Sequence, residues 1–458
     1  MMKLIFVHGW SVTNTRTYGD LPAVLAAPSD QHDIDMEISH VHLGRYISFH
    51  DEVSMEDVAR AFDQALRDTL ATQNGSIQKF SCITHSTGGP VVREWVERFY
   101  GAELLSDLPL EHLIMLAPAN HGSSLAAIGK ERVSRINSWF QGVKPGQGIL
   151  DWLVLGSNGQ WRLNERSLNY SLAENNFFPF VLTGQDIDSK FYDFLNSYLT
   201  EVGSDGVVRV ASANLNFRYV RLVQSDGIVR KRPKTLSLKV DGVIRKSEGA
   251  GFGLIPNASH AGSTMGIMNS VKLNADPQKP VIDQIFGCLK VGDKKEYDTQ
   301  ALALEALTTD TQSQTDRNMM MVFQIKDDRG QTIKDYDLLL LGGKRYSPGK
   351  LPEGYFIDKQ MNAETGRLVY YVNAKKLQTL GAIGFRVIAR PDKGFTHYAA
   401  GEFHSDEINV AELIVPNQTL YVEIEMKRRV ARNVFKLGSP SAKTTEFKSE
   451  KPAKEILN

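Results

Sequence analysis

The chain has 458 residues, of which 42% are hydrophobic and 23% charged, and its 53 basic residues balance its 53 acidic ones. This composition is typical of a globular protein of two or three domains, and the charge balance gives no electrostatic reason to expect nucleic-acid binding. Two cysteines are too few for a disulfide framework. No apolar run approaches the roughly 18–20 residues of a membrane span, and the first residues, MMKLIFVHGW, lack a signal-peptide pattern. We therefore expect a chain made in the cytoplasm that, if exported, does not use an N-terminal signal.

Apolar runs and amphipathic stretches alternate in the first part of the chain. Buried strands are predicted at 3–7, 36–43, 77–84, 112–117 and 178–183, and amphipathic helices at 54–70 and 90–100. Strands that alternate with helices indicate a mostly parallel sheet covered on both faces. We therefore predict an α/β domain over residues 1–300.

Two insertions interrupt this pattern. Between 123 and 176 the strands stop and the chain is rich in tryptophan, including Trp139 and Trp152, which fits either a satellite core or a lid-like wall for an apolar substrate. Residues 215–256 read as basic strands joined by turns, which fits either a solvated face or contact with anionic lipid headgroups. Both alternatives stay open for each insertion.

The last part of the chain has a different pattern. A polar linker is predicted over 301–318, followed over 319–437 by short strands with period-two alternation, which is typical of an all-β sandwich domain. Residues 438–458 are rich in Lys, Ser and Glu and predict a disordered tail.

The stretch FSCITHSTGGPVVREWVERF at 80–99 predicts a strand, a sharp turn at Ser86 and a helix. A serine hydroxyl needs a base to take its proton and N–H donors for the oxyanion that forms. This turn exposes the hydroxyl at the sheet edge and aims the helix N-terminus at it, while Gly88 and Gly89 leave room for the crowded backbones. Thr84 stands where the common G-x-S-x-G motif has glycine and needs more space. Ser86 is the predicted nucleophile.

The other parts of a catalytic triad follow in the order serine, acid, histidine, as in α/β-hydrolases. Asp205 lies in a Ser-Asp-Gly turn before an apolar run and is the favoured acid, with Asp186 and Asp188 as alternatives. His260, in the small-residue loop IPNASHAGSTMG, is the predicted base. His85, His121 and His40 are rival bases, but His85, as the neighbour of the serine, is expected to point away from it.

The turn FVHGW after the first strand places the backbone N–H of Trp10 where it can donate to the oxyanion, and Thr87 N–H follows the serine. These two groups form the predicted oxyanion hole. No cluster of His, Cys and Asp has the spacing of a metal site, and no cofactor is expected.

Four motifs resemble those of α/β-hydrolases of the lipase type, a group that includes bacterial lipases, lecithin–cholesterol acyltransferase and GPI inositol-deacylase-like proteins. They are HGW at 8–10, THSTGG at 84–89, LIMLAPANHGSSLA at 113–126, and SDGVVRVASA with SHAG at 204–213 and 259–262. The resemblance covers about residues 3–285 and implies an α/β-hydrolase core with a helical lid insertion. It leaves the predicted β-sandwich domain unexplained. The resemblance also places Asn120 and His121 near the site. The other predicted substrate contacts are His8 and Gly9 of the HGW turn, His85 beside the serine, and Trp139 and Trp152 of the Trp-rich insertion.

The predicted function is a serine ester hydrolase acting on acyl lipids, a lipase or phospholipase, through an acyl-enzyme on Ser86. A second hypothesis is acyl transfer to an alcohol by the same residues. A third, which rests on the domain layout alone, is a secreted antibacterial effector of a type VI-like system. In that case the β domain binds a membrane surface or a protein partner, such as an immunity or secretion protein.

Overall fold

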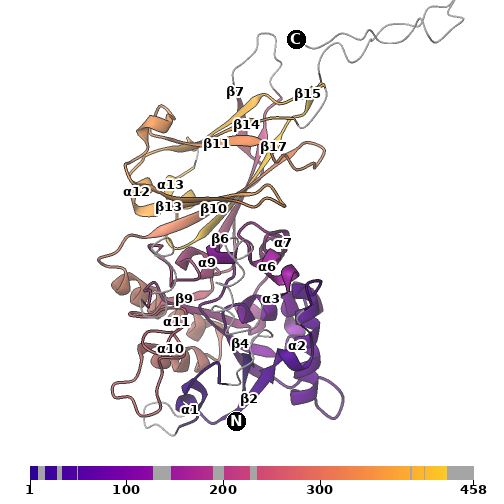
Figure 1. Ribbon diagram of the computed structural model, residues 1–458, viewed down its shortest axis with the longest axis vertical. Coiled ribbons are helices and arrows are strands. Elements are labelled where there is room, and N and C mark those ends of the chain that lie inside the picture. The colour runs from indigo at the N-terminus through magenta and orange to yellow at the C-terminus, as the bar shows by residue number, and fades with distance from the viewer. Residues whose placement is uncertain are drawn as a thin grey trace, which may run out of the picture.

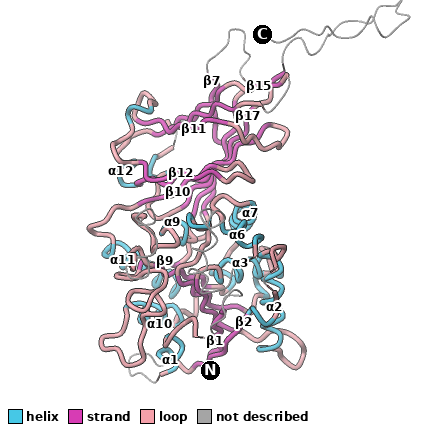
Figure 2. Tube along the Cα trace, in the orientation of Figure 1, coloured by secondary structure: helices cyan, strands magenta, loops and turns pink. Residues whose placement is uncertain are grey.

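The structure, a computed structural model, describes residues 1–8, 16–27, 34–48, 50–126, 146–188, 201–226, 235–391, 395–406 and 408–430 (Figure 1). An α/β domain that contains the N-terminus and a β domain follow each other along the long axis of the molecule (Figures 1 and 2). Among the described residues, no helix is both long and apolar enough to span a membrane.

The α/β domain is built on a six-stranded sheet in which all neighbouring strands are parallel, in the order β2-β1-β3-β4-β5-β9. Its strands are β1 (Met2–His8), β2 (Met36–His42), β3 (Phe80–His85), β4 (Leu110–Leu116), β5 (Phe178–Thr183) and β9 (Gly251–Leu254). The central strands are buried on both faces, as their unbroken apolar runs predict. The predicted α/β fold is confirmed.

Helices cover both faces of this sheet. They are α1 (Leu21–Ala26), α2 (Met55–Leu70), α3 (Gly88–Phe99), α6 (Gln147–Leu153), α7 (Asn158–Ser167), α9 (Val210–Ala213), α10 (Pro280–Leu289) and α11 (Lys294–Thr311). Alternate residues of the strands pack against α2 and α3 on one face and against α1, α10 and α11 on the other. Helix α2 starts with a capping box, in which the Ser54 side chain accepts from Asp57 N–H and the Asp57 side chain accepts from Ser54 N–H.

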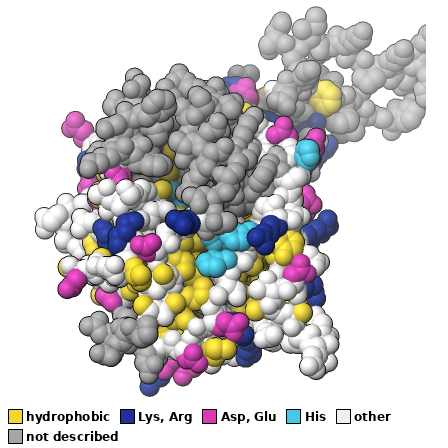
Figure 3. Space-filling view, turned by 60° about the horizontal axis from the view of Figure 1, so that its bottom comes forward, with side chains coloured by type: hydrophobic (Ala, Val, Ile, Leu, Met, Phe, Trp, Pro, Cys, Tyr) yellow, Lys and Arg dark blue, Asp and Glu magenta, His cyan; other side chains and the backbone are white. Residues whose placement is uncertain are grey.

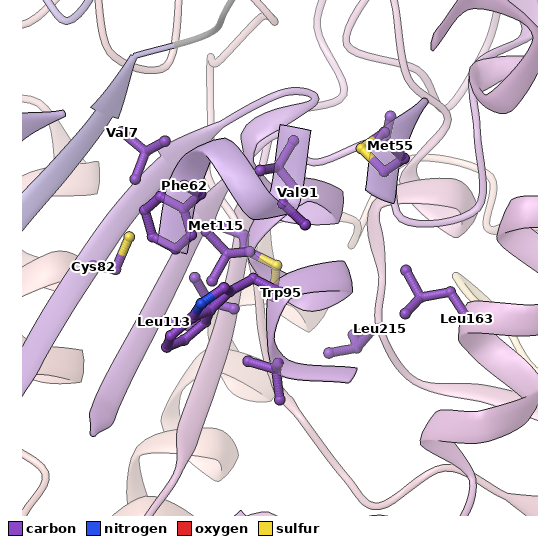
Figure 4. Packing of buried hydrophobic residues seen from close by; sticks show 14 of the residues in the cluster. Val7, Met55, Phe62, Cys82, Val91, Trp95, Leu113, Met115, Leu163 and Leu215 are labelled. Atoms are coloured by element: carbon purple, nitrogen blue, oxygen red, sulfur yellow. The ribbon is translucent and has the colours of Figure 1, made fainter. Parts of the chain in front are cut away.

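Trp95 of α3 lies in the apolar layer between α2, α3 and the sheet (Figure 4). Its ring meets that of Phe62 edge-on with centroids 5.5 Å apart, and its indole N–H donates to Asp63 Oδ1 at 3.0 Å. Because the side chain is fully buried and its N–H is bonded, it fixes the position of α3 on the sheet. The amino end of this helix follows Ser86 directly.

The β domain contains a ten-stranded mixed sheet in the order β11-β14-β16-β7-β6-β17-β10-β13-β12, with β8 paired to β6. Its strands are β6 (Phe217–Gln224), β7 (Thr235–Val240), β8 (Arg245–Lys246), β10 (Asn318–Asp327), β11 (Tyr336–Gly342), β12 (Phe356–Met361), β13 (Leu368–Asn373), β14 (Ile383–Ala389), β16 (Ala400–His404) and β17 (Thr419–Met426). Strands β15 (Thr396–His397) and β18 (Arg429–Val430) form a separate pair, and α12 (Ala374–Gln378) and α13 (Val410–Leu413) are short helices.

The two halves of this sheet pack face to face around one apolar core. The rings of Phe323 in β10 and Phe385 in β14 have centroids 5.2 Å apart, and the Tyr370 hydroxyl of β13 donates to the Leu338 carbonyl of β11 at 2.7 Å. The region that the sequence assigns to a sandwich is therefore a large sheet folded over on itself.

The domain boundaries differ from the predicted ones in two places. Strands β6 and β7, from the predicted insertion at 215–256, belong to the sheet of the β domain, where they pair with β17 and β16. Period-two alternation identifies a strand but does not say which sheet it joins.

The predicted linker at 301–318 is helical as far as Thr311, with Leu304 buried against β9. Helix α11 buries only a few of its side chains, so its sequence reads as polar. The predicted tail at 438–458 lies outside the described residues.

Candidate active site

Ser86 occupies the turn between β3 and α3 with φ at +54°, a left-handed conformation that non-glycine residues seldom adopt. Its N–H donates to Leu116 O at 3.0 Å, and its carbonyl accepts from the N–H groups of Gly89 and Ala119, both at 3.4 Å. These bonds hold the serine at the carboxyl ends of the central strands, with its side chain half-buried. This is the strained strand-to-helix turn that the sequence predicts.

The small residues after Ser86 are required by their surroundings. A Cβ atom at Gly89 would lie 2.9 Å from Pro118 Cβ and 3.1 Å from Met115 Sδ, too close for any side chain. A Cβ atom at Gly88 would lie 3.2 Å from Thr84 Cβ. Thr84 therefore packs directly against Gly88. Because Gly88 has no side chain, the larger Thr84 fits at the position where the motif usually has glycine.

His260 and Asp205 converge on the serine. His260 Nε2 lies 3.1 Å from Ser86 Oγ, and His260 Nδ1 lies 2.9 Å from Asp205 Oδ2. Both His260 and Asp205 are buried, so solvent does not compete for these contacts. The structure thus brings together the serine, base and acid that the sequence proposes.

Backbone groups orient the Asp205 carboxylate. Its Oδ1 accepts from Val207 N–H at 3.0 Å and Val208 N–H at 2.8 Å, which leaves Oδ2 for the imidazole. The alternative acids lie elsewhere: the N–H of Asp186 donates to Ala258 O at 3.1 Å, and the carboxylate of Asp188 lies against Gly262. Because His260 Nδ1 lies within hydrogen-bond distance of Asp205, the geometry favours Asp205 as the acid over Asp186 and Asp188.

His85, predicted as a substrate contact, bonds to the loop that carries His260. Its Nε2–H donates to the His260 carbonyl at 3.0 Å, and the two rings have centroids 4.7 Å apart. Burial, with a further contribution from His260, lowers the pKa of His85 well below its ordinary value. A neutral His85 therefore fixes the backbone of the loop that carries His260, a role that no sequence signal indicated.

Asn120 and His121, predicted as substrate contacts, are both buried. Asn120 Nδ2 donates to Ala213 O at 2.8 Å. The His121 ring lies 2.8 Å from the Tyr421 hydroxyl and 2.9 Å from Asn214 O. Burial, with the nearby Arg93 charge, lowers the pKa of His121 to about 3. The side-chain bonds of Asn120 to Ala213 and Arg93 stay within the α/β domain, whereas the His121 ring joins the two domains.

The remaining predicted residues lie in different places. His8 ends β1 in contact with His40, at 2.9 Å between ring nitrogens, and with His42, at 4.3 Å between ring centroids. Histidine side chains gather on one face, between basic residues (Figure 3).

Trp152 of α6, also predicted as a substrate contact, belongs to the apolar core, with its ring against Gly159. This part of the Trp-rich insertion therefore contributes to the core of the α/β domain.

Part of the predicted oxyanion hole is described. Thr87 is the N-cap of α3, so its N–H is among the first of the helix, which point out of the amino end without an intrahelical acceptor. Gly9, Trp10 and Trp139 lie outside the described residues.

The buried neutral histidines predict that acid destabilises the fold. The pKa of His121 is lowered to about 3, chiefly by burial, whereas an unfolded histidine binds a proton near pH 6.5. Below about pH 6.5 the unfolded state therefore binds more protons than the folded state, and the free energy of unfolding falls as the pH drops toward 3. This histidine contributes up to about 1.4 kcal/mol per pH unit to that fall.

We expect His121→Gln to make the free energy of unfolding less dependent on pH between about 5 and 6.5, as measured by urea unfolding. The exposed His397 gives the matched control, because its replacement by Gln removes a histidine without emptying a buried site. Equal pH slopes for His121→Gln and wild type would contradict the prediction.

Two solved structures of phospholipase PlaB from Legionella pneumophila match this chain over its whole length. Each is 40% identical, with a TM-score of 0.86 and 100% of both chains covered, and one of them is a complex with thio-NAD. Lipase BlEst2 of Bacillus licheniformis matches weakly, at 19% identity over 46% of this chain and 79% of its own, with a TM-score of 0.34. Neither models of protein families nor curated protein sequences gave a match. The full-length match to PlaB confirms the lipase-type α/β-hydrolase resemblance, and the chain belongs to the family of phospholipase PlaB as a serine hydrolase of the lipase and esterase kind.

Proposed function

We propose that this chain is a phospholipase that cleaves the carboxylic esters of acyl lipids through a Ser86–His260–Asp205 triad. The observation that carries the proposal is the unbroken series of contacts from Ser86 Oγ to His260 Nε2, at 3.1 Å, and from His260 Nδ1 to Asp205 Oδ2, at 2.9 Å. The phospholipid class of substrate comes from the similarity to PlaB.

In the first step, Ser86 Oγ attacks the ester carbonyl carbon while His260 Nε2 accepts the hydroxyl proton. Asp205 Oδ2 accepts the Nδ1–H bond, which holds the imidazole in the required tautomer and stabilises the imidazolium that forms. The tetrahedral oxyanion accepts hydrogen bonds from Thr87 N–H and from the predicted second donor, Trp10 N–H. The positive end of the α3 dipole adds to this stabilisation.

The intermediate then collapses. The C–O bond to the lipid alcohol breaks, and the alcohol leaves with the proton from His260, which yields an acyl-enzyme on Ser86. Water attacks this ester as His260 takes its proton, and a second collapse releases the fatty acid and restores the serine. An alcohol in place of water would give acyl transfer, so product analysis with and without an alcohol acceptor separates the two reactions.

A fluorophosphonate probe tests the nucleophile directly. We expect the probe to modify wild-type protein at one residue, mapped by peptide mass spectrometry to Ser86, and to block release of fatty acid from phospholipid vesicles in proportion to labelling. The Ser86→Ala variant should take up no label. Labelling at another serine, or full hydrolysis by fully labelled protein, would refute the proposal.

A further inference from the structure

We infer that the β domain positions the acid of the triad, and that Tyr371 is the positioning residue through which it does so. The inference rests on the proposed function, because it concerns how Asp205 is held in place for His260. It gives the β domain a part in the reaction that does not require it to touch the substrate.

Asp205 lies in a compact loop between β5 and β6. The N–H of Val210 donates to Gly203 O at 2.9 Å, and the N–H of Asp205 donates to Val208 O at 3.2 Å. The N–H of Gly206 donates to Ser204 Oγ at 3.1 Å. These bonds give the loop a fixed internal shape, so a displacement of its base displaces the carboxylate as well.

The β domain holds the base of this loop from one side. The Tyr371 hydroxyl of β13 lies 3.0 Å from both Val202 O and Gly203 O, and it can donate to either. Asn318 Nδ2 of β10 donates to Val202 O at 3.1 Å and to the Tyr371 hydroxyl at 3.2 Å. A Cβ atom at Gly203 would lie 2.7 Å from the Tyr371 hydroxyl, so the contact leaves no room for movement toward the sheet.

Arg209, at the carboxyl end of the loop, forms ion pairs with Glu201 at the amino end and with Asp358 of the β domain. Its fully buried guanidinium bonds to Glu201 at 2.6 and 2.8 Å and forms an ion pair with Asp358 of β12. The same guanidinium lies 4.4 Å from the centroid of the Tyr371 ring. A buried charge of this kind is stable only while its partners stay in place. Arg209 therefore ties both ends of the loop to one surface of the β domain.

The α/β domain holds the same loop on the side of the acid: Ser123 Oγ donates to Val207 O at 2.6 Å, and His260 N–H donates to Asp205 O at 2.9 Å. The side chains of Val207 and Val208 are also buried in its apolar core. The hydrogen bond between Asp205 and His260 is therefore held in place from both domains, and the Tyr371 hydroxyl is its anchor in the β domain. Since a misplacement of about 1 Å can cost up to 100-fold in rate, loss of that anchor should appear in kcat.

Tyr371→Phe tests the inference, because it removes the hydroxyl and keeps the ring over Arg209. Tyr370→Phe is the matched control: it removes a buried hydroxyl from the adjacent residue of the same strand, and that hydroxyl donates to Leu338 O within the β domain. With p-nitrophenyl acyl esters we expect kcat of Tyr371→Phe to fall roughly ten-fold with KM changed less than about two-fold. Tyr370→Phe should keep the wild-type kcat, even where its melting temperature falls equally.

Proton NMR distinguishes a positioning role of Tyr371 from a general loss of stability, because it reports directly on the hydrogen bond between His260 and Asp205. We expect the low-field signal of the His260 Nδ1 proton to shift or broaden in Tyr371→Phe and to stay unchanged in Tyr370→Phe. Asp358→Asn, which removes one partner of Arg209 at a partly exposed position, should lower kcat in the same direction.

Equal kcat in Tyr371→Phe and Tyr370→Phe, or a change confined to KM, would overturn the positioning role while leaving the nucleophile intact. Retained activity in Ser86→Ala would instead remove the proposed function itself.

Discussion

Ser86→Ala should lower kcat for p-nitrophenyl acyl esters by roughly 10⁴- to 10⁶-fold while the protein stays folded. The hydroxyl is the group that faces His260 Nε2, at 3.1 Å, and without it the base has no nucleophile to activate. Folding should be retained because the turn is held by backbone hydrogen bonds. A left-handed φ of +54° also costs alanine about as much conformational free energy as serine.

Circular dichroism and the melting temperature check that the variant is folded, and ester hydrolysis measures the loss. Ser76→Ala, at an exposed turn serine, is the control and should keep wild-type turnover. Turnover by Ser86→Ala within ten-fold of wild type would mean that another residue carries the acyl group.

Asp205→Asn should lower kcat by about 10⁴-fold with little change in KM. In the wild type, Oδ1 accepts from the N–H groups of Val207 and Val208, and Oδ2 faces His260 Nδ1. In the variant, the oxygen of the new side-chain amide would stay with the two N–H donors, so its NH₂ would face the ring. That group donates, and it therefore forces the imidazole proton onto Nε2, where the proton of Ser86 has to be accepted.

Asp186→Asn is the comparison for this prediction, because Asp186 is a rival acid on the sequence and its N–H bonds to the loop before His260. Its kcat should stay within about three-fold of wild type. The reverse ranking of the two variants would assign the acid to Asp186.

The sequence predicts the elements of the site that are local. Ser86 is recognisable because it lies in a turn between a buried strand and an amphipathic helix, all within twenty residues. Asp205 and His260 come after it in the expected order. Their convergence follows from the topology of a parallel sheet, whose loops meet at the carboxyl ends of the strands.

Contacts between distant parts of the chain are not predictable in this way. His121 follows β4, the neighbour of β3 in the sheet, yet its ring bonds to Tyr421, 300 residues further on. Strand β6 has the alternation of a surface hairpin, but it pairs with the distant strand β17, where Thr419 lies opposite Phe217. Nothing in the residues around Asp205 identifies Tyr371 or Asn318 as its supports, because these contacts exist only after the two domains have met.

The β domain takes its strands from two stretches of the chain on either side of β9, α10 and α11, so no single cut separates the two domains. A product ending before β10 would keep β6 and β7 but lose their neighbours β17 and β16. Val220, Leu222 and Leu238, all buried in the intact protein, would then be open to solvent beside unpaired strand edges, the arrangement that favours aggregation. Truncated forms of this hydrolase should therefore be insoluble, and shorter versions would have to be made by trimming loops.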